Sequence, residues 1–166
     1  MEPVTSEEPE DNFLQKIKDL CHKNGAVFIL DEMITGFRWD LRGAHRYYGV
    51  EPDLVTFGKG MANGFSVAAL LGKEEIMKLG SIKEEGQERV FLISTTQGAE
   101  MSGMSALVKN IEIYKRDNVT DHLWKFGREL TKNLNSLSKD MGLEEHFYIE
   151  GIPCSQIFAT KDREGN

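Results

Sequence analysis

Short apolar runs alternate with helix-like repeats along the chain. Two runs, Ala26–Leu30 and Leu54–Phe57, are rich in β-branched and aromatic side chains. Continuous apolar runs of this length predict strands that are buried on both faces of a sheet. Asp11–Lys23 precedes the first run and repeats its apolar residues at helical spacing, so it predicts a helix that ends at Asn24-Gly25.

The same alternation continues to the end of the chain. It predicts further strands at Val67–Leu71, Val90–Ile93, Phe147–Glu150 and Gln156–Thr160, and helices at Lys73–Gly80, at Ala99–Lys115 and from Thr120 to Gly142. Thr120 is the expected N-cap of the last helix, whose apolar face comprises Leu123, Leu130, Leu134, Leu137 and Met141. Strands that alternate with helices are typical of doubly wound α/β domains.

Length and charge narrow the classes of function. A chain of 166 residues suits one domain. Its 20 basic and 27 acidic residues give a formal charge of −7, which disfavours nucleic acid or an anionic membrane as the main partner. No signal peptide opens the chain and no apolar run is as long as a membrane span, so we expect a cytoplasmic protein.

Cysteine and histidine spacing gives no sign of a metal site. Cys21 and Cys154 lie far apart and form no C-x-x-C motif, which predicts two free thiols in a reducing compartment. The four histidines show no metal-ligand spacing. We therefore predict no bound metal.

Each of the first two apolar runs ends on a group that can do chemistry. Asp31 and Glu32 follow the first run, and Lys59 follows the second between two glycines. The carboxyl ends of parallel strands meet at one crevice, so Asp31 and Lys59 are expected to converge there. Pyridoxal phosphate requires such a pair, because a lysine amine bonds its aldehyde and a carboxylate pairs with its ring nitrogen. Taken alone, Lys59 also suits a solvated loop, and Asp31 a turn or helix cap.

Several spaced motifs carry a resemblance to a known family. They are L-D-E-M-I-T-G-F-R, G-A-H-R-Y-Y-G-V-E-P-D-L-V-T-F-G-K and V-A-A-L-L-G-K-E-E-I-M, all within Ile29–Met77. This segment resembles the class-III aminotransferases of the fold-type-I pyridoxal phosphate enzymes, and most closely their glutamate-1-semialdehyde 2,1-aminomutase branch.

The resemblance implies roles for individual residues. Lys59 would form the Schiff base with the cofactor and then act as base and acid on the substrate carbon, and Asp31 would pair with the ring nitrogen. Met33 stands where family members often have a valine against the ring. Thr95, with Thr96 as the alternative, would bind the phosphate of the cofactor held mainly by the other subunit. From the residues alone, the hydroxyls of Ser94–Gly98 suit helix capping as well as phosphate binding.

The resemblance also implies a fold and a reaction. Residues 1–118 would be the second half of a cofactor-binding large domain with a mostly parallel sheet and helices, and 119–166 the start of an α+β C-terminal domain. The full-length protein would be a homodimer that moves an amino group between an amino-group donor and a carbonyl substrate. This chain covers less than half of a family member, so we expect it to be inactive alone.

Two other functions stay open at this stage. One is an aminotransferase acting on an amino sugar or an ω-amine, and the other is a non-catalytic α/β interaction module derived from the same fold. A separate question concerns Arg38, Arg42 and Arg46, which suit either an anion site or a solvated, salt-bridged face. The adjacent Tyr47 and Tyr48 are expected to be packing residues.

Overall fold

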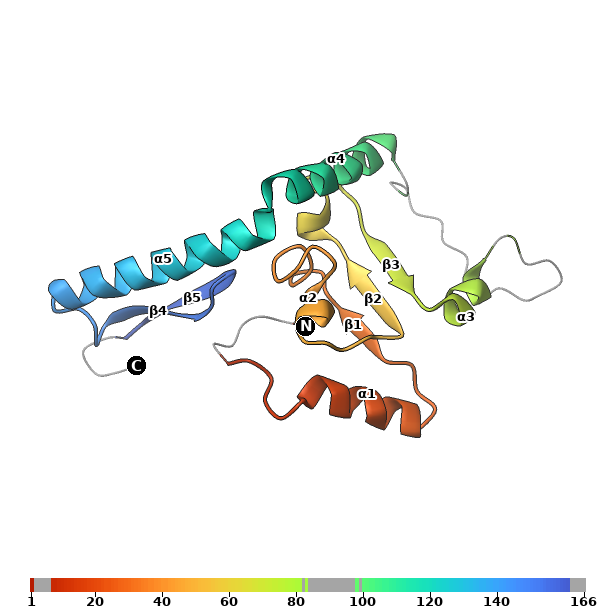
Figure 1. The fold of residues 1–166 in the computed structure, drawn as a ribbon, viewed down its shortest axis with the longest axis horizontal. Coiled ribbons are helices and arrows are strands. Elements are labelled where there is room, and N and C mark those ends of the chain that lie inside the picture. Colours follow the sequence, from red (N-terminus) through yellow and green to blue (C-terminus); the bar gives the residue numbers. More distant parts are fainter. Residues whose placement is uncertain (2–6, 82, 84–97, 99, 162–166) are drawn as a thin grey trace.

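The computed structural model describes residues 1, 7–81, 83, 98 and 100–161 (Figure 1). Its helices are α1 (Phe13–Lys23), α2 (Ala44–Tyr47), α3 (Glu74–Met77), α4 (Met101–Asp117) and α5 (Val119–Asp140), with 3-10 turns η1 (Lys59–Met61) and η2 (Lys78–Gly80). Its strands are β1 (Ile29–Asp31), β2 (Leu54–Phe57), β3 (Ala69–Gly72), β4 (Phe147–Ile152) and β5 (Ser155–Thr160). The predicted strand Val90–Ile93 lies outside the described residues.

The first three strands form one sheet in the order β1-β2-β3. β1 and β2 are parallel, with Leu30 opposite Val55, whereas β3 is antiparallel to β2, with Leu71 opposite Val55. The parallel pair therefore places the ends of β1 and β2 at the same edge, as the sequence predicts. The element order combines strands and helices in a partial α/β domain.

One face of this sheet is covered by helices. Leu30, Val55 and Phe57 belong to a buried cluster against which residues of both α1 and α4 pack. The prediction that the strands are buried on both faces is wrong for the described part of the chain, because on the face opposite Leu30 Ile29 is 54% exposed and Leu70 is 41% exposed. The described helices pack on the side of Leu30 and leave the other side open to solvent.

Backbone conformation explains why two helices begin at other residues than the sequence predicts. α1 begins at Phe13 and not at Asp11, because Asp11 and Asn12 have positive φ angles of 50° and 56°. Thr120 is not an N-cap, since α5 already begins at Val119. Asn118, with φ 48°, ends α4 and precedes α5, so the two helices meet at a bend.

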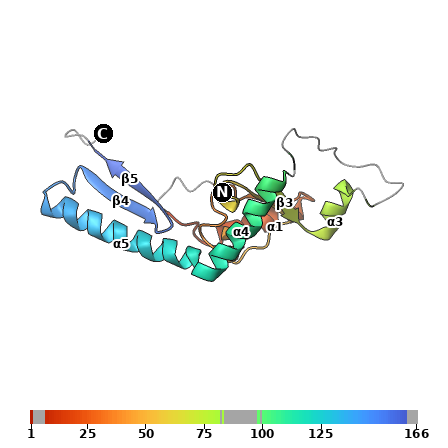
Figure 2. The same cartoon turned by 90° about the horizontal axis from the view of Figure 1, so that it is seen from above.

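The α5 helix and the antiparallel β4-β5 hairpin extend as an arm away from the three-stranded sheet (Figures 1 and 2). Asn135 holds the hairpin, because its amide donates to Ile149 O and accepts from Ile149 N, both at 2.8 Å. A Cβ atom on Gly127 would lie 1.8 Å from Pro153 O, so only glycine permits this approach. The hairpin thus packs on the side of α5 that carries small and polar residues, among them Gly127 and Asn135.

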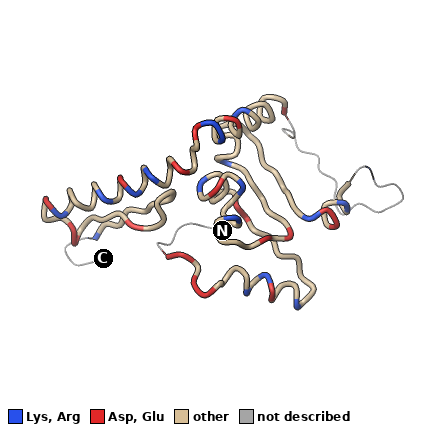
Figure 3. Tube along the Cα trace, viewed as in Figure 1, with Lys and Arg blue, Asp and Glu red and all other residues tan. Residues whose placement is uncertain are grey.

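The apolar face predicted for α5 is correspondingly open. Leu137 is 53% exposed and Met141 is 62% exposed. Basic and acidic residues are interspersed along the same helix (Figure 3). In the part of the chain that the structure describes, no helix is long and apolar enough to cross a membrane.

Candidate active site

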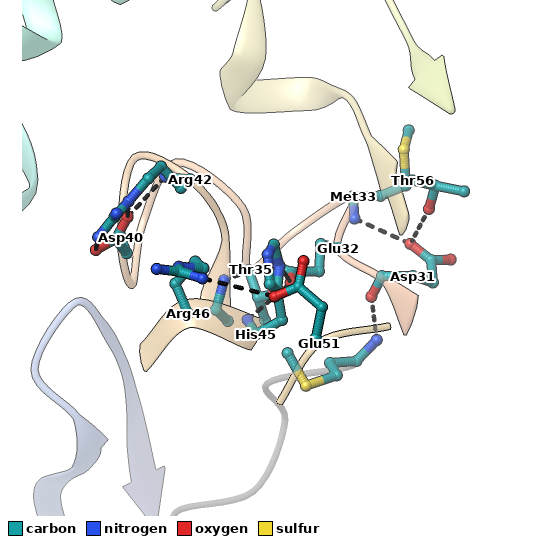
Figure 4. A network of polar contacts seen from close by, with 12 residues as sticks. Asp31, Glu32, Met33, Thr35, Asp40, Arg42, His45, Arg46, Glu51 and Thr56 are labelled. Atoms are coloured by element: carbon teal, nitrogen blue, oxygen red, sulfur yellow. Dashed lines mark hydrogen bonds and ion pairs between the residues drawn. The ribbon is translucent and has the colours of Figure 1, made fainter. Parts of the chain in front are cut away.

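Asp31 lies at the carboxyl end of β1, on the open face of the sheet. Its Oδ1 atom accepts hydrogen bonds from Met33 N at 2.9 Å and from Thr56 Oγ1 at 3.1 Å (Figure 4). The bond from the Met33 N–H, helped by Thr56 and by the positive charges of the N-terminal amino group and Lys59, lowers the pKa of Asp31. Asp31 is therefore an ionised carboxylate that remains accessible to a cationic partner.

Lys59 lies one residue beyond the end of β2, after Gly58, and is exposed to solvent. Its φ of 46° lies in the left-handed region, which costs a residue with a Cβ atom about 1–2 kcal/mol. The Asn110 side chain of α4 stabilises the turn that follows, because it donates to Gly60 O and Met61 O at 3.0 Å each. No ion pair or hydrogen bond engages the Lys59 amine among the described residues, and backbone strain of this kind is typical of functional positions.

Asp31, Met33 and Lys59 share one cavity. Together with Met1 and Ile34 they line a space of about 130 Å³. Met33 lies over the residue that precedes Lys59, since a Cβ atom on Gly58 would lie 2.2 Å from Met33 Cε. The structure thus brings three of the predicted site residues together. The other two, Thr95 and Thr96, lie outside the described residues.

Glu32 has a larger part in the site than the sequence indicates. It is fully buried beside His45 (Figure 4). Its carboxylate accepts hydrogen bonds from Ala44 N and, at 2.8 Å, from His45 N. His45 Nδ1 lies 2.7 Å from Glu32 Oε1, and Thr35 Oγ1 donates to Oε2 at 3.4 Å. We call Glu32, Thr35, Ala44 and His45 the Glu32 cluster. The sequence does hold one sign of this burial. Successive side chains of a strand point to opposite faces of the sheet, so when Asp31 is on the open face, Glu32 must point to the covered face.

A second buried carboxylate lies at the opposite end of the same strands. Asp53 is 4% exposed and contacts Lys73 Nζ at 2.6 Å, Phe28 N at 2.8 Å and His22 Nε2 at 2.8 Å. Burial alone raises the pKa of Asp53, but the bonds from Lys73, Phe28 and His22 outweigh it and hold the pKa well below its usual range. We call these four residues the Asp53 cluster.

Arg42, Arg46 and Tyr47 make contacts within the protein that do not require a bound ligand. Arg42 pairs with Asp40 at 3.3 Å and Arg46 with Glu51 at 3.5 Å, which favours a salt-bridged face over an anion site. Tyr47 stacks on Trp124 of α5 with ring centroids 5.2 Å apart, in keeping with a packing role.

The cysteines and the acidic and histidine side chains form no metal site in the described part of the chain. Both cysteines are free thiols. No group of three or more Cys, His, Asp or Glu side chains converges there as metal ligands would.

The profile of the class-III aminotransferases matches residues 1–146. The chain belongs to this family. The resemblance carried by the Ile29–Met77 motifs is therefore confirmed.

Class-III relatives with named activities cover most of the chain. The chain is 37% identical over 156 residues to a 3-aminobutyryl-CoA aminotransferase of Cloacimonas acidaminovorans. This match covers 94% of this chain and 36% of the relative. The chain is 34% identical over 131 residues to a glutamate-1-semialdehyde 2,1-aminomutase of Acetivibrio thermocellus, covering 79% of this chain and 30% of the relative. The chain thus spans about a third of the length of these relatives.

Solved structures show the same fold. An ω-transaminase from Sphaerobacter thermophilus superposes with a TM-score of 0.73 at 26% identity, covering 88% of this chain and 32% of that one. The FumI protein of Sphingopyxis sp. MTA144, solved in its pyridoxal phosphate internal aldimine form, gives a TM-score of 0.81 at 22% identity over 96% of this chain and 36% of that one. Both neighbours support a partial fold-type-I α/β domain.

Proposed function

We propose that this chain is the lysine- and aspartate-bearing part of a pyridoxal phosphate-dependent aminotransferase or aminomutase. One observation carries the proposal: Asp31 and Lys59, which come from different strands, line the same cavity at the carboxyl ends of β1 and β2. Membership of the class-III family supports it. Retention of both groups in one cavity also disfavours a non-catalytic interaction module.

The residues of the cavity fit this cofactor. Asp31 is held in its ionised form, so it can keep a proton on the ring nitrogen. The Met33 side chain lies against Gly58 and lines the cavity, where a flexible thioether can pack against a flat ring. The bound cofactor supplies an electron sink for the substrate carbanion.

Lys59 has the properties that the remaining chemistry needs. Its amine, which no described residue engages, can bond the cofactor's aldehyde. Once a substrate amine displaces it, the same nitrogen can move a proton at the substrate carbon. The left-handed backbone at Lys59 and the bonds from Asn110 keep this residue at the end of β2.

For the whole protein, we propose transfer of an amino group between a small-molecule amino donor and a carbonyl substrate. The aminomutase relatives favour the glutamate-1-semialdehyde 2,1-aminomutase type of reaction. The 3-aminobutyryl-CoA aminotransferase and the ω-transaminase favour the second candidate, an aminotransferase acting on an ω-amine or an amino sugar.

We also propose the domain division and assembly of the whole protein. Residues 1–118 would form the second half of a large domain and 119–166 the start of the small one, and the bend at Asn118 supports this division. We further propose a homodimer for the whole protein, in keeping with its class-III family, in which Thr95 or Thr96 would reach the phosphate of the partner's cofactor. A cytoplasmic location remains a prediction.

An absorbance titration tests the proposal. The 166-residue chain is titrated with pyridoxal phosphate, and the band that forms when an amine bonds the aldehyde is followed. We expect the band with the parent chain and with Lys16→Ala, and its loss in Lys59→Ala. An unchanged band in Lys59→Ala would contradict the proposed role of this lysine.

A further inference from the structure

We propose that the Glu32–His45 pair is a positioning device that holds the Met33 N–H donor against Asp31 from the opposite face of the sheet. This inference rests on the proposed function, because it deepens the role given to Asp31. Asp31 is exposed and Glu32 is completely buried, so adjacent side chains point to opposite faces of the sheet. Neither Glu32 nor His45 lines the cavity that contains Asp31 and Lys59.

The backbone of Glu32 connects the two faces. Glu32 N donates to Thr56 O at 3.0 Å, which continues the β1-β2 ladder by one residue beyond Asp31. Glu32 O accepts from Gly36 N at 3.0 Å, which closes the turn that follows. Met33 lies inside this turn, and its N–H is the main group that lowers the pKa of Asp31. Fixing the Glu32 side chain therefore fixes the donor on which Asp31 depends.

The Glu32 cluster also reaches the strand that leads to Lys59. The His45 ring lies 6.5 Å from the Phe57 ring, measured between centroids. Phe57 in turn fills the space beside Gly36, where a Cβ atom would lie 2.4 Å from the Phe57 ring. The buried Glu32–His45 pair is therefore linked both to the turn that holds Asp31 and, through Phe57, to the strand that leads to Lys59.

A carboxylate is required at position 32. Both carboxylate oxygens of Glu32 accept a hydrogen bond from the backbone. Oε2 accepts from the Ala44 N–H and Oε1 accepts from the His45 N–H. In a glutamine, the amide NH₂ would face one of these N–H donors, so the turn could not keep its hydrogen bonds. A buried polar group without a partner is costly, and the backbone would shift to relieve it.

The experiment measures the Asp31 titration directly by carboxyl-carbon NMR on the 166-residue chain, with the resonance assigned by its loss in Asp31→Asn. Four variants are compared with the parent: Glu32→Gln, His45→Ala, His45→Asn and Asp53→Asn. In His45→Asn the side-chain nitrogen can stand where His45 Nδ1 stands, so the bond to Glu32 is restored while the ring contact is lost. Asp53→Asn is the matched control, since it alters the other buried carboxylate of the same strands.

We expect the titration midpoint of Asp31 to rise in Glu32→Gln and in His45→Ala, and to return toward the parent value in His45→Asn. It should stay unchanged in Asp53→Asn. Affinity for pyridoxal phosphate should fall about threefold to tenfold in the first two variants, as the loss of one supporting hydrogen bond predicts.

Other results would overturn the inference. One is an Asp31 midpoint that does not move in His45→Ala, and another is an equal rise in Asp53→Asn, which would show a general loss of structure. If Glu32→Gln does not fold, the two His45 variants decide the question. If the parent never bonds pyridoxal phosphate, the proposed function fails, and the Asp31 midpoints still test the positioning role.

Discussion

The parallel strands β1 and β2 carry an aspartate at each end, and the two aspartates have opposite surroundings. At the amino end, Asp53 is buried and bound to Lys73, His22 and the Phe28 N–H. At the carboxyl end, Asp31 is exposed and shares a cavity with Lys59, which has no ion pair among the described residues.

This difference gives the two Asp–Lys pairs different roles: Asp53 and Lys73 stabilise the fold, whereas Asp31 and Lys59 are available for reaction. The contact with Asp53 raises the pKa of Lys73, so that amine stays protonated and is a poor nucleophile. Lys59 has no such contact in the described chain and lies in a strained backbone conformation. The same two residue types therefore stabilise the fold at one end and remain available for reaction at the other.

The largest effect on stability is expected from Asp53→Ala. Removing the carboxylate leaves the buried Phe28 N–H without its acceptor and separates Lys73 and His22 from their partner. We expect the free energy of unfolding to fall by about 3 kcal/mol, less than for a fully buried pair because the Lys73 and His22 side chains both reach solvent. Urea unfolding measures this, and a change below about 1 kcal/mol would contradict the account.

Asp31→Ala should show the reverse pattern. Because Asp31 is exposed, the free energy of unfolding should change by no more than about 0.5 kcal/mol. Affinity for pyridoxal phosphate should fall about 10–100-fold, since a hydrogen bond to a charged group contributes about 1.5–3 kcal/mol. Absorbance titration and urea unfolding of the same sample test both halves, and unchanged affinity would refute the assignment.

Acid should weaken the amino end more than the carboxyl end. The pKa of Asp53 is depressed in the folded state, so its contribution to stability is full above the ordinary pKa of 3.8 and is lost as the pH falls toward the folded value. Parent and Asp53→Asn should therefore converge in stability between about pH 4 and pH 2. Urea midpoints across this range measure it, and a constant difference would argue against the shift.

The smallest effect is expected from Thr56→Val, which keeps the shape of the side chain and removes one donor to Asp31. The bond from Met33 remains, so the pKa of Asp31 should rise only slightly and affinity for pyridoxal phosphate should fall about threefold. Carboxyl NMR and absorbance titration measure the two quantities. A larger loss than in Asp31→Ala would show that Thr56 acts in some other way.

Local pattern predicted most of the described elements. The β2 run matches Leu54–Phe57, and α1, α4 and the β4-β5 hairpin lie within a few residues of their predicted positions. Convergence of Asp31 and Lys59 followed from the rule that parallel strands present their ends together. These features depend on the sequence nearby and on one rule of topology.

The errors concern features that distant parts of the chain determine. Apolar content at Ile29 cannot show that one face of the sheet stays open, because coverage depends on which helices pack there. Burial of Glu32 depends on donors at Ala44 and His45, twelve and thirteen residues away. The left-handed backbone at Asp11, Asn12 and Lys59 has no apolar pattern that would reveal it.

The most direct test of the account asks which lysine bonds the cofactor. The 166-residue chain is mixed with pyridoxal phosphate, reduced with borohydride and digested, and the labelled peptides are quantified by mass spectrometry. We predict that the label lies mainly on Lys59, and that Lys73, held by Asp53, remains unlabelled. A label on Lys73 or Lys16 equal to that on Lys59 would contradict the account.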